Sequence, residues 1–371
     1  MNKILILTTS TGQGHNQAAS SVAESFENAG YEVIKHDFLA KNSRFLNEAI
    51  VIGYEVLASK FPKIYGSFYK LTDKKITNSL LKLPFLLTKR KVLKLINKIN
   101  PDVIVATHSL SVNIISDLKK HGLTVPYISI VTDFKAHYTY VSPYVDAYIT
   151  GSTYTKKSLI DRNVNANKIY PIGIPINKRF YTEITHANDL KDGKYFNLLL
   201  MSGSLGLNTI ELVLKELLKN PNKLRITVVC GKNAHLKDTL INYCNSNKFI
   251  NKKLHILGFT KDISYLMDYC DIIISKPGGL TVTESIVKNI PLVIPFAIPG
   301  QESENIDFLT SEGYALYVKD LTKINDAIND IIENPNKLSQ MRLQLNNLSS
   351  TYSLTKIVEV AEELQKRWPL D

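Results

Sequence analysis

The sequence predicts an α/β protein of two domains, each built around a parallel sheet. Its 371 residues exceed the usual size of a single domain, so two hydrophobic cores are expected. The stretches 3–36 and 271–296 each contain a buried strand, a glycine turn, a helix and a second strand. That unit builds parallel sheets, and its turn lies at the carboxyl end of the first strand, where such sheets bind ligands.

Residues 1–180 are predicted to form the first Rossmann-like domain. Residues 44–98 have helical character, interrupted by Pro62 and Pro84. Apolar runs in this half indicate strands at 3–9, 31–36, 101–108, 126–132 and 146–150, and helices at 16–29 and 153–162.

Residues 195–350 are predicted to form the second Rossmann-like domain, after a polar linker at 181–194. An amphipathic helix at 353–367 lies in the last segment, 351–371, which we expect to pack back on the first domain. The second domain is expected to contain strands at 196–201, 225–230, 255–259, 272–274 and 291–296, and a helix at 280–289.

A phosphate site is predicted where the strand at 272–274 ends. Gly278 and Gly279 let backbone N–H groups approach an anion, and the next helix points its positive N-terminus at the same place. Thr281 and Thr283 add hydroxyl donors. Glu284 either accepts two hydrogen bonds from a vicinal diol such as a ribose or only complements the helix dipole.

Two more loops carry candidate ligand groups. Gln301, Glu302 and Asn305 follow a buried strand, where polar side chains either bind a ligand or only solvate a turn. The loop of Gly12, Gly14 and His15 follows the first strand, but it lacks the third glycine of a dinucleotide fingerprint.

These motifs, K-P-G-G-x-T-x-x-E, P-G-Q-E-x-x-N and G-x-G-H, together resemble the nucleotide-sugar site of the diacylglycerol glycosyltransferases. That family includes the bacterial processive diacylglycerol glucosyltransferases and the plant monogalactosyldiacylglycerol synthases. It is related more distantly to the N-acetylglucosaminyltransferase that makes lipid II. The resemblance implies the GT-B architecture, two facing Rossmann-like domains with the active site in the cleft between them.

The resemblance also implies an inverting transfer of a hexose from UDP-hexose to 1,2-diacylglycerol. Glucose is favoured over galactose, and transfer can repeat because glycosylated lipids also end in hydroxyl groups. The segment ending at Phe259 is expected to hold the uracil, and a second glycine-rich turn at Gly203 and Ser204 either faces the donor or is only a tight turn. The expected donor-binding residues are Gly14, Gly203, Ser204, Phe259, Gly278, Gly279, Thr281, Glu284, Gln301, Glu302 and Asn305.

His15 is the first candidate for the general base that takes the proton of the acceptor hydroxyl, because its ordinary pKa lies near neutral pH. It could instead donate to a nearby carbonyl or contact the sugar or phosphate. Asp133 is the second candidate base, although an aspartate there also suits a helix cap. His108 and His137 follow neighbouring strands, are expected on the acceptor side and compete for the same role as base.

The excess of positive over negative charge is confined to the first half of the chain. Residues 1–180 hold 24 Lys and Arg against 12 Asp and Glu, and residues 60–98 hold eleven basic residues and one acid among aromatic and leucine side chains. This composition favours an anionic membrane surface over nucleic acid, with a merely solvated basic face as the alternative. Lys89, Arg90, Lys91 and Lys94 are the candidate membrane contacts.

No Asp-x-Asp occurs, so we expect UDP-sugar as a co-substrate without a metal or other cofactor. Three widely spaced cysteines and no signal-peptide pattern predict a cytoplasmic protein bound peripherally to the inner face of the cell membrane. The alternatives are another UDP-sugar enzyme of this fold, such as a 2-epimerase or a lipid-intermediate N-acetylglucosaminyltransferase, and a non-catalytic UDP-sugar sensor.

Overall fold

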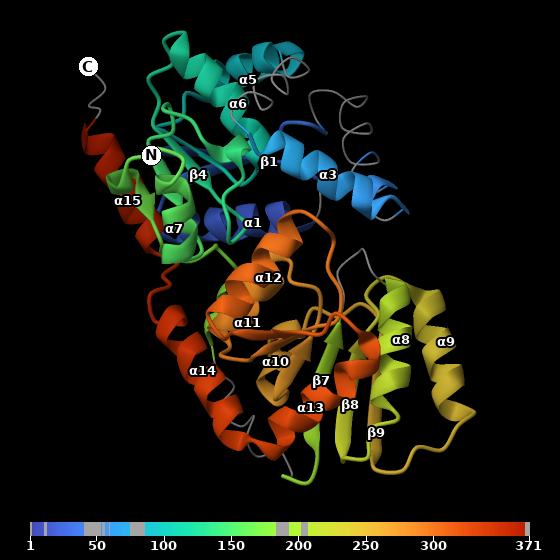
Figure 1. Cartoon of the computed structure of the whole chain (residues 1–371). Coiled ribbons are helices and arrows are strands. Elements are labelled where there is room, and N and C mark those ends of the chain that lie inside the picture. The colour runs from blue at the N-terminus through green and yellow to red at the C-terminus, as the bar shows by residue number, and fades with distance from the viewer. Residues whose placement is uncertain are drawn as a thin grey trace. The chain divides into compact units, whose positions relative to one another are not determined.

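The computed structural model of the protein describes residues 2–10, 13–40, 53, 56–58, 60–74, 86–182, 193–201 and 207–367. The chain divides into two compact units, each with one parallel six-stranded sheet flanked by helices (Figure 1). The predicted pair of Rossmann-like domains is therefore confirmed. The first unit comprises Met1–Lys178, Pro299–Glu304 and Thr351–Asp371, and the second comprises Arg179–Ile298 and Asn305–Ser350.

The sheet of the first unit has the strand order β2-β1-β3-β4-β5-β6. Its central strands are continuous apolar runs because helices cover both faces of the sheet. The register places Ile4 of β1 opposite Val103 of β3. The strands are β1 (Lys3–Thr8), β2 (Glu32–Asp37), β3 (Val103–Ala106), β4 (Tyr127–Ile130), β5 (Ala147–Ile149) and β6 (Ile169–Tyr170).

Six of the helices described in the first unit are α1 (Gln13–Asn28), α3 (Pro62–Thr72), α5 (Leu86–Ile99), α6 (Ser109–Lys120), α7 (Thr153–Ile160) and α15 (Lys356–Arg367). Pro62 occupies the first turn of α3, where its missing N–H leaves no helical bond unmade. The C-terminal helix α15 packs beside α1 and buries Ile357, Val360 and Leu364 (Figure 1). Short 3₁₀ turns occur at Tyr138–Tyr140 and Ala166–Lys168.

The sheet of the second unit has the order β12-β11-β10-β7-β8-β9. Its strands are β7 (Phe196–Met201), β8 (Leu224–Val229), β9 (Lys252–Leu257), β10 (Ile272–Ile274), β11 (Leu292–Ile294) and β12 (Ala315–Tyr317). Its helices are α8 (Leu207–Leu217), α9 (Ala234–Asn245), α10 (Ile263–Tyr269), α11 (Gly279–Val287), the greater part of α12 (Gln301–Ser311), α13 (Ile324–Glu333) and α14 (Pro335–Ser349). Further 3₁₀ turns occur at Lys178–Tyr181 and Leu321–Lys323.

The strand predicted at 255–259 was placed too late in the chain. The observed strand β9 begins at Lys252 and ends at Leu257, so Gly258 and Phe259 follow it. β9 lies at the edge of its sheet, and its residues alternate in exposure, so an edge position explains why a strand can begin with two lysines. No helix within the described residues is both long and apolar enough to cross a membrane.

Candidate active site

The glycine turn of the second unit connects β10 to α11. Gly278 caps α11 without any side-chain hydrogen bond to the first turn. Within the part of the chain that the structure describes, the N–H groups of Gly279, Leu280 and Thr281 donate to no other protein group. Three partly exposed donors therefore point out of the positive end of a nine-residue helix. The geometry suits an anion such as a diphosphate.

A hydrogen bond from the side chain of Asn305 holds the turn in place. Nδ2 of Asn305 donates to the carbonyl oxygen of Pro277 at 2.9 Å, and the residue is fully buried. The amide therefore fixes the shape of the turn. Asn305 thereby acts on the turn through the carbonyl oxygen of Pro277.

Glu284, in the second turn of α11, has no hydrogen-bond or ion-pair partner among the described residues. Desolvation by the surrounding protein raises the pKa of its carboxyl group to about 8, although part of the side chain still reaches solvent. Such a group lacks the donors that would stabilise its charge. A ligand that supplies two hydroxyl donors would satisfy it, which is the ribose contact that the motif predicts.

Thr283 was wrongly expected to offer a free hydroxyl. Its Oγ1 donates to the carbonyl oxygen of Gly279 at 2.7 Å, within the same helix, and the residue is fully buried. The bond from a threonine to the carbonyl four residues earlier is common inside helices. Thr281 is partly exposed in the first turn, so of the two threonines it is the one open to a ligand.

The remaining predicted donor contacts lie elsewhere. Phe259 is 60% exposed in the loop after β9, with the Lys232 ammonium 5.9 Å from its ring centroid. Gln301 and Glu302 begin α12, directly after Gly300, which adopts φ +109°. Gln301 is partly exposed, whereas Glu302 is 1% exposed. The predicted turn at Gly203 and Ser204, like Gly12 of the G-x-G-H motif, lies outside the described residues.

In the first unit, the ends of β3 and β4 and the first turn of α1 bring polar groups to His15. Its Nδ1 lies 2.7 Å from the carbonyl oxygen of Thr107. A carbonyl only accepts, so Nδ1 carries the proton and Nε2 keeps its lone pair. Burial lowers the pKa of His15 to about 4, against the opposing effect of the Thr107 hydrogen bond. The ring is therefore neutral at pH 7, with a fixed tautomer and the lone pair on Nε2. It is a weaker base in the folded protein than the ordinary pKa of histidine predicts.

His108 lies against His15, with ring centroids 4.4 Å apart in an edge-to-face arrangement. It is the N-cap of α6, and its Nδ1 accepts from the N–H of Leu110 at 3.1 Å. Burial and the neighbouring His15 hold the pKa of His108 well below its usual range. The neutral ring then carries its proton on Nε2. The pair offers one acceptor nitrogen and one donor nitrogen.

The other two predicted residues are placed differently. Asp133 directly follows Thr132 in the chain, and the Thr132 hydroxyl lies 3.4 Å from His15 Nδ1. His137 is 8% exposed, and its Nε2 lies 3.1 Å from the carbonyl oxygen of Tyr69. Desolvation lowers the pKa of His137 against the attraction of Asp73. Its ring is occupied in packing α3, which the sequence pattern did not indicate.

The predicted membrane contacts lie on α5, whose buried side packs through Val92 and Ile96 into the core of the unit. Arg90, Lys91 and Lys94 are exposed on its outer side. Lys89 instead forms an ion pair with Asp117 of α6 and is less exposed. On α3, four apolar side chains, Phe61 (at the N-cap), Ile64, Phe68 and Leu71, are each 50% exposed or more.

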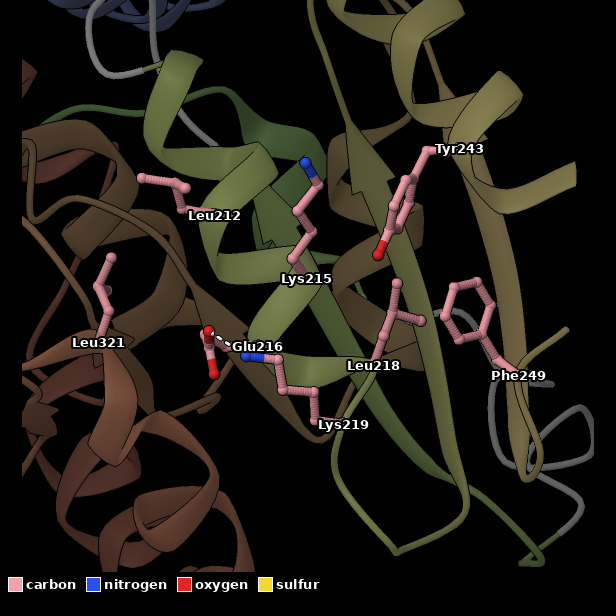
Figure 2. Close-up of a pocket in the computed structure, with 8 residues that line it drawn as sticks. All are labelled: Leu212, Lys215, Glu216, Leu218, Lys219, Tyr243, Phe249 and Leu321. Atoms are coloured by element: carbon pink, nitrogen blue, oxygen red, sulfur yellow. Dashed lines mark hydrogen bonds and ion pairs between the residues drawn. The ribbon is translucent and has the colours of Figure 1, made fainter. Parts of the chain in front are cut away.

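A pocket of about 450 Å³ lies on the second unit, and none of the candidate site residues described above lines it. Figure 2 shows the residues that line it: Leu212, Lys215 and Glu216 of α8, Leu218 and Lys219 directly after it, Tyr243 of α9, and Phe249 and Leu321. Its lysines are already paired, Lys215 with Glu211 at 2.7 Å and Lys219 with Glu216 at 2.6 Å, and none of the predicted site residues lines it. The described residues also contain no group of three His, Cys, Asp or Glu side chains placed to hold a metal ion.

The sequence matches two family models in succession. Residues 15–176 match monogalactosyldiacylglycerol (MGDG) synthase, and residues 197–361 match the glycosyltransferase family 28 C-terminal domain. The chain is also similar to the processive diacylglycerol beta-glucosyltransferase of Bacillus pumilus, with 28% identity over 362 residues that cover 96% of this chain and 94% of the relative. The enzyme of the same name from Bacillus subtilis is 28% identical over 364 residues, again covering 96% and 94%.

Solved structures share the fold. MurG of Acinetobacter baumannii superposes with a TM-score of 0.68 at 17% identity, covering 99% of this chain and all of that one. Anabaena HepE in complex with UDP-glucose gives a TM-score of 0.58 at 14% identity, with the same coverage. These likenesses identify the GT-B glycosyltransferase fold.

Proposed function

Because the chain belongs to the family of the processive diacylglycerol glucosyltransferases and the monogalactosyldiacylglycerol synthases, we propose that it transfers a hexose from UDP-hexose to the free hydroxyl of 1,2-diacylglycerol. Glucose is the first candidate, because the curated relatives that match nearly the whole chain are glucosyltransferases. The product keeps free hydroxyl groups and can itself serve as an acceptor.

The observation that carries the donor assignment is the start of α11. Its unpartnered N–H groups suit a diphosphate, and the unpartnered carboxylate of Glu284 suits a ribose diol, within two turns of the same helix. A structural helix end would more commonly carry a side-chain cap, and a structural carboxylate a partner. A nucleoside diphosphate supplies both missing sets of hydrogen bonds at once.

In the proposed reaction, the acceptor oxygen attacks the anomeric carbon of the hexose from the side opposite the diphosphate. A new C–O bond forms, the bond from the anomeric carbon to the diphosphate oxygen breaks, and UDP leaves with that electron pair. The proton of the acceptor hydroxyl passes to Nε2 of His15, the nitrogen that its tautomer leaves free. Attack from the opposite face inverts the configuration at the anomeric carbon.

The charge that develops on the leaving UDP is taken up by the N–H groups and the positive end of α11. We infer that no metal ion or organic cofactor takes part, since these donors are already fixed before the substrate binds. Turnover that is unchanged by a chelator such as EDTA supports this inference, and loss of turnover that added Mg²⁺ restores overturns it.

The lipid acceptor lies in a bilayer, so the protein needs a surface that binds to the bilayer. The exposed apolar residues of α3, from Phe61 to Leu71, have lysines on either side of them and between them in the sequence: Lys60, Lys63, Lys70 and Lys74. Helix α5 adds Arg90, Lys91 and Lys94. Apolar side chains enter the interfacial region of a bilayer while basic ones bind anionic headgroups, at about 1 kcal/mol for each basic residue. We propose that these two helices dock the protein on an anionic membrane surface.

The test of the proposed function is release of UDP from a panel of UDP-sugars, with and without diacylglycerol vesicles. Transfer to lipid predicts release from UDP-glucose or UDP-galactose that requires diacylglycerol. Conversion of UDP-N-acetylglucosamine to its C2 epimer without any lipid, seen by chromatography of the sugar nucleotide, would instead identify a 2-epimerase. Binding with neither release nor conversion under any condition would identify a sensor.

A further inference from the structure

Helix α3 carries two residues that touch the segment Pro299–Glu304, which holds the predicted hexose contacts Gln301 and Glu302. Gly66 is buried on the face of α3 that is turned toward this segment. A Cβ atom placed on Gly66 would lie 2.7 Å from the Cβ of Pro299, closer than side chains approach in folded proteins. The absence of a side chain at position 66 is therefore what lets the segment lie against the helix.

One helical turn further, Tyr69 covers Gly300. A Cβ atom on Gly300 would lie 3.0 Å from Cγ of Tyr69, and Gly300 adopts φ +109°, a conformation open to glycine. Glu304 then forms an ion pair with Lys135 at the far end of the segment. The segment is thus held at both ends within the first unit.

Helix α3 is itself anchored to the body of the unit. Asp73, at its C-terminal end, accepts two hydrogen bonds from the Arg162 guanidinium, at 2.8 and 2.6 Å, and one from the N–H of Tyr138 at 2.7 Å. His137 Nε2 donates to the carbonyl of Tyr69 at 3.1 Å. Both oxygens of Asp73 accept from Nη2 of Arg162, and charge-assisted hydrogen bonds are roughly twice as strong as neutral ones.

We propose that Gly66 and Tyr69 are positioning residues for the hexose of the donor: α3 holds Pro299 and Gly300 in the conformation that places Gln301 and Glu302. Neither residue needs to touch the substrate. The inference rests on the proposed function, because it gives Gln301 and Glu302 the hexose end of UDP-hexose. It assigns no role to α3 in binding the diphosphate, whose donors lie on α11.

The test compares Gly66→Ala with Ser67→Ala, an exposed neighbour on the same helix. In an open helix position alanine would favour the helix in both variants. We expect Gly66→Ala to raise the KM for UDP-glucose at least tenfold, while the Kd of UDP, which lacks the hexose, stays within twofold of the parent. Ser67→Ala should match the parent in both. A parallel rise in the Kd of UDP would overturn the proposal, because it would indicate general damage.

A second-site variant tests the contact itself. Pro299→Gly removes the Cβ that the new methyl group would strike and leaves the nearest Pro299 atoms at 3.6 and 3.7 Å, ordinary contact distances. The KM of the double variant should therefore be no higher than that of Pro299→Gly alone. If the two single effects multiply instead, the contact is not the cause.

Tyr69→Leu is the alternative variant if Gly66→Ala does not fold. It removes the ring over Gly300 without adding an atom, and we expect the same rise in the KM for UDP-glucose.

Amide hydrogen exchange separates this inference from the proposed function. In Gly66→Ala, exchange should become faster in residues 300–304 and stay unchanged in residues 279–287. If amide exchange in residues 300–304 is unchanged, α3 does not hold this segment and the proposal is wrong. A parent protein that binds no UDP-hexose overturns the proposed function and the hexose role with it, while the exchange data still decide whether α3 holds the segment.

Discussion

Replacing Glu284 with glutamine should make the protein more stable and its donor binding weaker. The carboxyl group has an ordinary pKa of 4.5 and a folded-state pKa of about 8, because burial penalises its charge without any compensating partner. A pKa raised on folding gives stability that is complete below the ordinary pKa and is lost as the pH rises through the folded value. At pH 7 the loss is about 2–3 kcal/mol, allowing for partial exposure to water.

Glu284→Gln removes that loss and keeps the shape of the side chain. Its melting temperature should exceed that of the parent by roughly 4–12 °C at pH 7, and the two should converge near pH 4. Calorimetry at both pH values measures this difference. An equal difference at both values would mean that ionisation is not its cause.

The raised pKa of Glu284 also predicts that binding of UDP-glucose releases protons. At pH 7, below its raised pKa, the carboxyl group is mostly protonated, and hydrogen bonds from a ribose diol favour the ionised form, so binding of UDP-glucose should release protons. Titration calorimetry in buffers of different ionisation enthalpy counts those protons. UDP-glucose suits the measurement because its diphosphate ester has no group that titrates near neutral pH.

The expected result is a clear proton release for the parent and a release near zero for Glu284→Gln, whose affinity should fall by about 1–3 kcal/mol. Proton release that survives in Glu284→Gln would refute the assignment of Glu284 to the ribose. An unchanged affinity would refute it independently.

Three further predictions concern the first unit. His15→Ala should lower kcat by about 10²–10⁴ and change UDP-hexose affinity only a few-fold, and a variant that keeps more than a tenth of parental turnover would move the base to Asp133. Replacing Lys89, Arg90, Lys91 and Lys94 with Gln should weaken binding to anionic vesicles, most of all at low salt, without affecting a short-chain soluble acceptor; Lys89→Gln alone should have little effect, because Lys89 is paired with Asp117. Burial lowers the pKa of His15 and His108, so stability should fall as the pH drops below about 6.5, by about 2 kcal/mol at pH 5 for His15, whose pKa is lowered to about 4. His108→Asn keeps the helix cap and removes one of the two groups, so urea unfolding should show a smaller loss than in the parent; an equal loss would contradict the mechanism.

The parts of the fold that the sequence predicted are those that local pattern determines. Buried parallel strands appear as apolar runs, so β1, β3, β4, β7 and β10 were predicted close to their observed bounds. The edge strands were harder, because exposure removes the pattern. β9 begins with two lysines and was placed too late, and the three-residue strand β12, which ends at the exposed Tyr317, was not predicted.

In the candidate site, too, the features that the sequence predicted are those that depend on local pattern. The glycine turn and Glu284 follow from residue types at fixed spacing on one helix, which a sequence displays directly. The burial of His137 against Tyr69 and the room that Gly66 leaves for Pro299 depend on residues far apart in the chain. The contact of Thr107 with His15 could not be predicted either, because it is made by a backbone carbonyl that any residue could supply.

The central claim is that the protein builds a glycolipid, and the structure of the lipid product tests it most directly. The protein is incubated with UDP-glucose and diacylglycerol in anionic vesicles, and the extracted lipids are examined by mass spectrometry and NMR, with His15→Ala as the matched control. The account predicts a hexosyl diacylglycerol with inverted configuration at the anomeric carbon, formed by the parent and nearly absent with the variant. A parent that leaves diacylglycerol unmodified with every UDP-hexose, or a product with retained configuration, would contradict it.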